Sequence, residues 1–342
     1  MEDKQERLIV SEETQEERQQ NVSLRPTSLA EFLGQPHTID SLKIAIQAAT
    51  KRKEPLEHIL LSGPPGLGKT SLAACIAHEM KAEFFSTSGP AIERAGDLVG
   101  ILTNVKEGDI LFIDEIHRLS KVIEEFLYPA IENFQIDFVI DKGPYAKSIK
   151  IPLKPFTLIG ATTRKGLLSS PLRSRFGIFY NFDFYQPEEL GEIIRKSSQR
   201  LSLTIDEASI AEIARRARGT PRIANRIFKR VRDYAEVKTQ GVITRELTIE
   251  ALDHLRIDEY GLDDLDRRYL RSLVDFYKGG PVGIESLSAS LGEEKDVLMD
   301  VVEPFLIKLG FIKRTPKGRV ATEQVFKHME MDTRRQKQQR FL

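Results

Sequence analysis

The chain has 342 residues, with 51 Lys and Arg against 51 Asp and Glu, one Cys and no Trp. This length suggests two or three domains, one cysteine excludes a disulfide-stapled secreted domain, and no apolar run approaches the roughly 20 residues that a membrane span needs. A net charge of zero gives no overall reason to expect nucleic acid, because its binding partners usually carry a basic excess.

The N-terminus and the single cysteine indicate the compartment. Residues 1–20 carry seven acidic and three basic side chains, whereas a signal peptide begins basic and continues apolar. We therefore expect a mobile tail over 1–20, no membrane association and a cytoplasmic protein. Cys75 lies in an apolar stretch with no base beside it, which predicts a small buried residue and not a nucleophile.

Residues 1–184 alternate short apolar strands with amphipathic helices, which predicts a large α/β domain with a parallel sheet covered on both faces. Two further β-like segments surround a Gly-Pro turn and predict a β-hairpin inserted before the fourth strand. The expected strands are 58–62, 83–86, 110–114, 156–161 and 178–182, the expected helices include 71–80 and 121–133, and the hairpin comprises 134–140 and 148–153.

The remainder of the chain reads as two smaller domains. Residues 185–257 predict a small helical domain, with helices that begin at Pro187, after Asp206 and after Pro221. Residues 258–342 predict a winged helix. Its helices are expected over 264–277 and 295–309, its wing over 310–320, and a frayed end over 332–342.

The segment GPPGLGKT at 63–70 matches G-x-x-x-x-G-K-[ST] between an expected strand and an expected helix, which is the context of a P-loop. Its glycines let backbone N–H groups surround phosphate oxygens, and the helix N-terminus adds a favourable dipole. Lys69 is expected to reach the β- and γ-phosphates of ATP, and Thr70 to bind Mg²⁺. The nucleotide-binding residues expected here are Gly66, Gly68, Lys69, Thr70 and Ser71.

Polar side chains follow two of the buried strands. Asp114 and Glu115 end the 110–114 strand; beside a P-loop, the first is expected to hold Mg²⁺ and the second to polarise the attacking water. Thr162 or Thr163 could contact the γ-phosphate at the end of the next strand. His117 could equally pack, face solvent or couple these elements.

Three arginines are candidates for contact with the phosphates. Arg173 and Arg175 lie in a tight loop after the Thr-ending strand, and a permanently charged, planar guanidinium suits a finger supplied to a neighbouring subunit. A surface ion pair is the alternative for both. Arg222 begins a helix of the second domain and could reach the γ-phosphate or remain solvated.

These motifs together resemble the AAA+ ATPases. The resemblance rests on the P-loop, Asp114-Glu-Ile-His117, Gly160-Ala-Thr-Thr-Arg164, Arg173-Ser-Arg-Phe-Gly177 and Gly219-Thr-Pro-Arg222. From about residue 24 to about 325 the chain is more closely similar to the RuvB family of bacterial Holliday-junction branch-migration motors, above all in GGPVG at 279–283 and RTPKGR at 314–319.

That resemblance implies an activity and partners. Relatives form hexameric rings that move double-stranded DNA with ATP and Mg²⁺ during recombination and repair, without sequence preference. They work with RuvA, the tetrameric junction-binding protein, and the nuclease RuvC cuts the product. A ring of this kind would therefore be the expected form of the present chain.

The resemblance also implies roles residue by residue. Lys69, Asp114 and Glu115 would be catalytic, Thr163 would be the first sensor, Arg175 the finger with Arg173 as fallback, and Arg222 the second sensor. Leu24, Arg25 and Tyr185 would line the adenine pocket. Ile149 and Ile151 of the hairpin would dock RuvA, and Arg314 and Arg319 would contact the DNA backbone.

Charge is distributed unevenly along the chain. Residues 306–342 hold ten basic and three acidic side chains, so the zero balance is a cancellation of +7 here against −4 in residues 1–20 and −3 over residues 21–305. Basic contacts to phosphates give affinity without sequence information, which suits a motor that passes over any sequence.

Two other classes of function share part of this pattern. An AAA+ protein remodeller or clamp loader would keep the P-loop and Asp114-Glu115 but lack a basic wing. A winged-helix transcription regulator with an ATP switch would bind a defined sequence, which a footprint would reveal.

Overall fold

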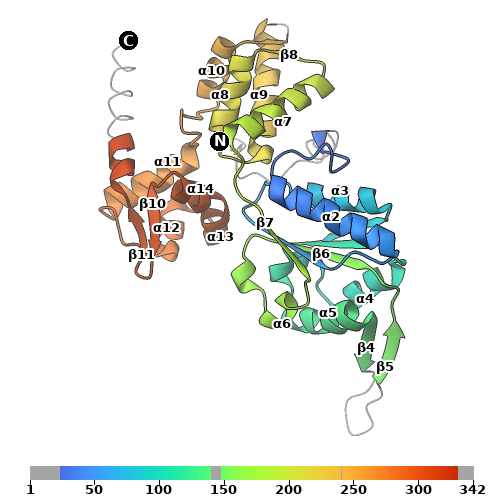
Figure 1. Cartoon of the computed structure of the whole chain (residues 1–342). Helices are drawn as coiled ribbons and strands as arrows, with labels where there is room; N and C mark the ends of the chain where they lie inside the picture. The colour runs from blue at the N-terminus through green and yellow to red at the C-terminus, as the bar shows by residue number, and fades with distance from the viewer. Residues whose placement is uncertain (1–23, 140–147, 240, 330–342) are drawn as a thin grey trace, which may run out of the picture. The chain divides into compact units, whose positions relative to one another are not determined.

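The computed structural model describes residues 24–139, 148–239 and 241–329. The chain divides into two compact units between Tyr185 and Gln186 (Figure 1). The tail predicted over 1–20, the turn of the predicted hairpin and the frayed end predicted over 332–342 lie outside the described residues.

A five-stranded parallel sheet in the order β2-β3-β6-β1-β7 forms the centre of the first unit. Helices α2 (Pro36–Arg52) and α3 (Lys69–Met80) lie on one face, and α4 (Ala95–Asn104), α5 (Lys121–Asn133) and α6 (Ser170–Arg173) on the other (Figure 1). The strands are β1 (Ile59–Ser62), β2 (Phe84–Ser88), β3 (Ile110–Asp114), β6 (Thr157–Thr162) and β7 (Ile178–Asn181). The predicted parallel sheet, covered on both faces, is confirmed.

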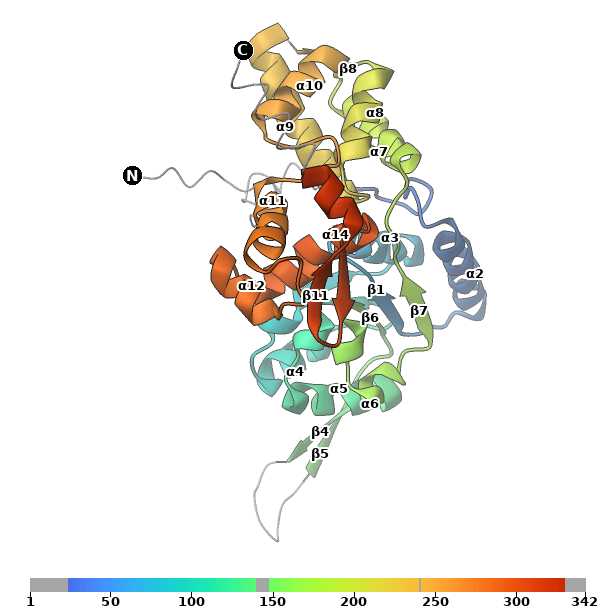
Figure 2. The ribbon, with the colours of Figure 1, turned by 90° about the vertical axis from the view of Figure 1, so that its left-hand side faces the viewer.

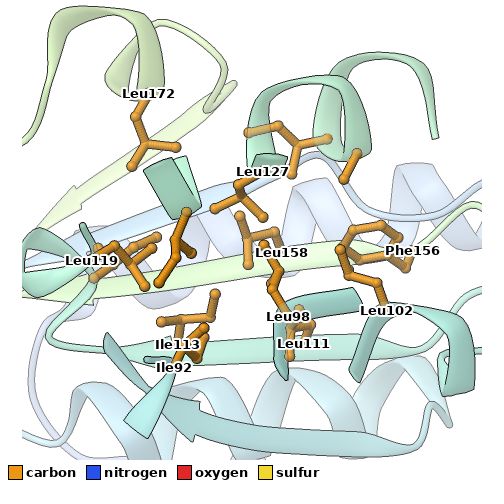
Figure 3. Close-up of a cluster of buried hydrophobic side chains, with 14 of the residues drawn as sticks. Ile92, Leu98, Leu102, Leu111, Ile113, Leu119, Leu127, Phe156, Leu158 and Leu172 are labelled. Atoms are coloured by element: carbon orange, nitrogen blue, oxygen red, sulfur yellow. The ribbon is translucent and has the colours of Figure 1, made fainter. Parts of the chain in front are cut away.

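The central strands of this unit are buried between the two layers of helices. Leu111 and Ile113 of β3 and Leu158 of β6 are buried against Leu98 of α4 and Leu127 of α5 (Figure 3). All residues of β6 are buried, as are the first four of β3, the pattern of strands covered on both sides. Because the strands are parallel, the carboxyl ends of β1, β3 and β6 lie at one edge of the sheet.

The inserted hairpin follows directly from α5. Strands β4 (Gln135–Val139) and β5 (Ser148–Pro152) pair antiparallel, with Ile136 opposite Ile151. Ile136 is buried and Ile151 packs against the same core, whereas Ile149 is about half exposed. The predicted hairpin is confirmed over its described strands, and Ile149 presents the more accessible apolar side chain.

The second unit contains a helical segment followed by a winged helix. The first part comprises α7 (Pro187–Arg200), α8 (Glu207–Arg216), α9 (Pro221–Thr239) and α10 (Arg245–His254), with the short strands β8 (Thr204–Ile205) and β9 (Val242–Ile243). The second comprises α11 (Asp264–Arg271), α12 (Ile284–Leu291), α13 (Lys295–Val297), α14 (Glu303–Lys308) and the hairpin β10 (Ile312–Thr315) and β11 (Gly318–Ala321). Figure 2 shows this wing beside α14.

Two helices predicted as continuous are interrupted. The α-helical part of 264–277 ends at Arg271 and continues as a wider turn to Phe276. The predicted 295–309 helix contains a similar turn over Leu298–Val302, because Pro304 has no N–H to donate to the turn before it. Helices α2, α4, α6, α10 and α12 were not predicted, and the tight loop expected around Arg173 contains the short helix α6.

Candidate nucleotide site and motor elements

The P-loop connects β1 to α3, which begins at Lys69. Gly63, Gly66 and Gly68 adopt φ angles of 144°, 79° and 95°, a region that side chains other than glycine rarely occupy. The Nζ atom of Lys69 donates hydrogen bonds of 2.8 Å to the carbonyl oxygens of Gly63 and Pro64. The loop therefore closes around a buried ammonium group.

Burial changes the acidity of this lysine. Desolvation lowers the pKa of Lys69 to about 8, and the carboxylates of Asp114 and Glu115 oppose that change. The predicted phosphate-binding lysine and the two predicted carboxylates thus lie close enough to interact.

Asp114 and Glu115 project from the end of β3 beside the P-loop. The Thr70 hydroxyl lies 3.5 Å from Oδ2 of Asp114, and Oδ1 of Asp114 accepts a 2.9 Å hydrogen bond from the backbone N–H of Glu115. A hydroxyl and a carboxylate are oxygen ligands of the kind that Mg²⁺ prefers, so the residues fit this ion.

The backbone of Glu115 is unusual. Its φ of 47° lies in the left-handed region, a strained conformation that concentrates at functional sites. Its carboxylate accepts a 3.0 Å hydrogen bond from Nη1 of Arg118. Arg118 was not among the predicted site residues, although its position three residues after Glu115 could have indicated the pair.

The two threonines at the end of β6 differ in their partners. Thr162 shares a 3.0 Å hydrogen bond with Nδ1 of His117 and accepts one from the backbone N–H of Arg164. The buried hydroxyl of Thr163 has no hydrogen-bond partner within the described part of the chain. Thr163 therefore retains the donor that a γ-phosphate oxygen could accept, and His117 links the ends of β3 and β6.

The segment after residue 23 packs on α3. Cys75 is buried and its thiol donates to the carbonyl oxygen of Pro26 over 3.4 Å, and burial raises its pKa to about 12. The prediction of a small buried cysteine is confirmed. Leu24 is buried and Arg25 is exposed in this segment, and both immediately precede Pro26, which contacts Cys75 of α3.

Tyr185 closes the other side of the P-loop. Its hydroxyl donates a 3.2 Å hydrogen bond to the carbonyl oxygen of Leu67. Phe32 and Gly34, which were not predicted as site residues, also lie here: the Phe32 ring is next to Gly68, and the Tyr185 ring lies against Gly34. The predicted pocket residue Tyr185 is thus in contact with the phosphate loop.

Gly34→Ala should displace Tyr185 and weaken nucleotide binding by about tenfold or more. A Cβ at position 34 would overlap the Tyr185 ring, and the φ of 75° would strain any side chain there. Titration with a fluorescent, slowly hydrolysed ATP analogue measures the effect. Gly166→Ala, where an added Cβ meets nothing within 4 Å, is the control; equal affinities for the two variants would contradict the assignment.

The side chain of the predicted finger, Arg175, is held by residues of its own chain. Its Nη2 atom lies 2.9 Å from Oε2 of Glu132, its Nη1 donates a 2.7 Å hydrogen bond to the carbonyl oxygen of Pro171, and its guanidinium lies 4.6 Å from the centroid of the Tyr128 ring. Arg173, the fallback, is exposed.

The second unit carries the other predicted arginines. Arg222 is exposed on the first turn of α9. Arg314 and Arg319 are cross-strand partners in the wing, on the side of the hairpin that also carries the buried Ile312. Their Nε atoms lie 2.5 and 2.8 Å from the oxygens of the fully buried Glu303.

Glu303 was not predicted from the sequence, yet it organises the wing. It accepts hydrogen bonds from Arg314, Arg319 and the Tyr269 hydroxyl. The side chain of Arg314 is 46% exposed and that of Arg319 only 15%. The two guanidinium groups are therefore fixed by one carboxylate, with Arg314 the more accessible.

Three family models match successive segments of the chain. They are described as the Holliday junction DNA helicase RuvB P-loop domain over 24–182, the RuvB AAA lid domain over 185–258 and the RuvB C-terminal winged helix domain over 259–330. The chain belongs to the RuvB family. It is therefore a P-loop AAA+ ATPase and a Holliday-junction branch-migration motor that binds nucleotide and DNA.

Solved structures of RuvB agree with this assignment. The structure of the Thermotoga maritima RuvB Holliday junction branch migration motor is 49% identical, with a TM-score of 0.83. A lysine-to-arginine mutant of the same protein is 50% identical, with a TM-score of 0.84. Each match covers 90% of this chain and 98% of the other. The remodeller and transcription-regulator alternatives are not supported.

No helix within the described residues is long and apolar enough to cross a membrane.

Proposed function

We propose that this RuvB-family chain acts in the cytoplasm as a hexameric ring that drives branch migration with RuvA, and that RuvC resolves the product. Three domains, 1–184, 185–257 and 258–342, would divide the work into hydrolysis, nucleotide sensing and DNA contact. The observation that carries the proposal is the buried Lys69 enclosed by the P-loop carbonyls, next to Thr70, Asp114 and Glu115.

The chemical roles follow from this arrangement. Lys69 exchanges its carbonyl partners for phosphate oxygens of ATP, and Gly66, Gly68 and Ser71 present backbone N–H groups to them. Thr70 and Asp114 would hold Mg²⁺, which would neutralise phosphate charge when bound. Glu115 accepts the proton of the attacking water.

Sensing and coupling require further side chains. The free hydroxyl of Thr163 supports its role as first sensor, and Arg222 is the second. Arg175 enters the neighbouring subunit's site, where an arginine stabilises transition-state charge. Leu24, Arg25 and Tyr185 enclose the adenine.

Partner contacts lie on the two hairpins. Ile149, half exposed on β5, and Ile151 are the proposed RuvA contacts. Arg314 and Arg319, fixed by Glu303, present their remaining guanidinium N–H groups to DNA phosphates. Such contacts carry no sequence information, as a motor on arbitrary DNA requires.

A labelled four-way junction tests the proposal. Products of branch migration should form with ATP and Mg²⁺ and increase at least tenfold with RuvA, because docking delivers the ring to the junction. The products are separated on a native gel, with EDTA or omitted ATP as controls. Junction dissociation without ATP, or a yield that RuvA leaves unchanged, would refute it.

A further inference from the structure

One face of α5 contacts the segment 169–175, which comprises the short helix α6 and Arg175. Glu124, Tyr128 and Glu132 recur every four residues, so they lie in line on one side of the helix. All three contact the segment 169–175. These three side chains together contact the backbone and side chains around Arg175, the proposed finger.

Glu124 binds Ser169, the first residue of this segment. Its buried carboxylate accepts a 2.6 Å hydrogen bond from the Ser169 hydroxyl and a 3.0 Å one from the Tyr128 hydroxyl. Ser169 in turn caps α6, accepting from the backbone N–H of Leu172. The loop before Arg175 is thereby fixed to α5, and the Tyr128 ring is oriented.

Glu132 anchors the side chain of Arg175 itself. Oε2 of Glu132 accepts from both Nε, at 3.2 Å, and Nη2, at 2.9 Å. The Tyr128 ring lies under the guanidinium, and the carbonyl oxygen of Pro171 accepts from Nη1. Three contacts from different directions leave this long side chain with little rotamer freedom.

We propose that Glu132 is a positioning residue for hydrolysis in the adjacent subunit: with Tyr128, it presets the direction of Arg175 before that arginine enters the neighbouring nucleotide site. The proposal rests on the proposed role of Arg175 as a finger supplied in trans.

The Glu132–Arg175 ion pair is exposed enough for the arginine to leave it. The side chain of Glu132 is 56% exposed and that of Arg175 is 25% exposed. A pair this accessible is weak, so the arginine can leave it for a phosphate oxygen. Preorganisation nevertheless counts, because misplacing a group by about 1 Å can cost about 10²-fold in rate.

Mixed rings test this inference. Subunits with Glu115→Gln keep a finger but lack the base, and subunits with Arg175→Ala keep the base but lack a finger. Mixing the two should restore ATP hydrolysis at interfaces where the intact finger faces an intact base. Failure of the mixture to hydrolyse ATP would overturn the trans finger itself, and the inference with it.

Glu132→Ala is then placed on one partner at a time. On the finger-donating Glu115→Gln subunit it should lower kcat about three- to tenfold with KM unchanged, since a partly exposed pair makes a modest contribution. On the Arg175→Ala subunit it should change nothing, because that chain supplies no finger. Glu132→Gln, which keeps an acceptor at the same position, should recover part of the loss.

The inference is decided by which of the two subunits loses kcat when it carries Glu132→Ala. Glu125→Ala, which removes an exposed carboxylate of the same helix, controls for surface charge and should leave kcat unchanged. An equal fall with Glu132→Ala on either partner would indicate a general structural role and overturn the inference, as would unchanged hydrolysis with Glu132→Ala on the donor.

Discussion

Replacing Glu115 by Gln should lower steady-state ATP hydrolysis by about 10²–10⁴-fold, the usual contribution of a general base. Gln keeps the size and polarity of the side chain but cannot accept the proton of the attacking water. Lys69, Thr70 and Asp114 are untouched, so nucleotide binding should change by no more than about threefold. Branch migration in the junction assay should be lost together with hydrolysis.

The measurement pairs a phosphate-release assay with titration of a fluorescent ATP analogue on the same preparation. Glu107→Gln, a substitution in an exposed loop, controls for the loss of one negative charge. Hydrolysis above about one tenth of the wild-type rate would show that Glu115 is not the base. A parallel loss of nucleotide binding would instead assign it a binding role.

Much of the first unit was predictable because its signals are local. The 110–114 strand was predicted to the residue, since Ile110–Ile113 form an apolar run that ends in Asp114. The P-loop spacing placed Lys69 and Thr70 at the start of a helix. The 121–133 helix was also predicted, because its apolar residues recur at helical spacing, and in the structure Ser120 caps it.

Other elements gave weaker local signals. Helix α2 begins after Gln35, which caps it with no side-chain hydrogen bond, and only Pro36 marks its first turn. Helix α4 contains two glycines within ten residues, which lowers its intrinsic helix propensity. Both helices form because tertiary packing buries Leu42 and Leu98, and this stabilisation cannot be read from a single segment.

The sequence did not predict which charged residues form ion pairs with one another. From the sequence, Glu303 reads as an ordinary glutamate inside the predicted 295–309 helix, yet it is fully buried between Arg314 and Arg319. Glu132 likewise reads as a solvated helix residue. Sequence patterns locate a charge on an element, but its partner depends on which elements the fold brings together.

Arg218 is the most consequential partner of this kind, and removing it should destabilise the second unit by about 3–5 kcal/mol. It follows α8 with a φ of 57° and is almost fully buried. Its guanidinium pairs with Asp266, donates a 2.8 Å hydrogen bond from Nε to the carbonyl oxygen of Gly261, and lies 5.0 Å from the centroid of the Phe305 ring.

Asp266 depends on this arginine. It is fully buried in the first turn of α11, where it and Asp263 each accept a 2.9 Å hydrogen bond from the other's backbone N–H. Burial raises the pKa of Asp266, and the nearby Arg218 opposes that rise. Arg218→Met therefore leaves an uncompensated buried carboxyl group, whereas Asp266→Asn leaves a buried guanidinium that cannot lose its proton.

The loss in Arg218→Met should depend on pH. Without the arginine, the pKa of Asp266 in the folded state rises further above its value in the unfolded chain. The folded state then binds more protons than the unfolded state between these two pKa values, so stability falls as pH rises through that window. Arg218→Met should consequently be less damaging at pH 5 than at pH 8.

Hydrogen exchange of the intact chain measures this effect locally, because a protein of several domains has no single unfolding transition. At pH 8, exchange of amides in α8 and α11 should accelerate by about 10²–10⁴-fold, the equivalent of about 3–5 kcal/mol. Arg256→Met is the matched control, since it removes an exposed arginine paired with Asp264 of the same helix, and should change exchange by less than about threefold. Equal exchange in the two variants would mean that the buried pair contributes no more to stability than a surface one.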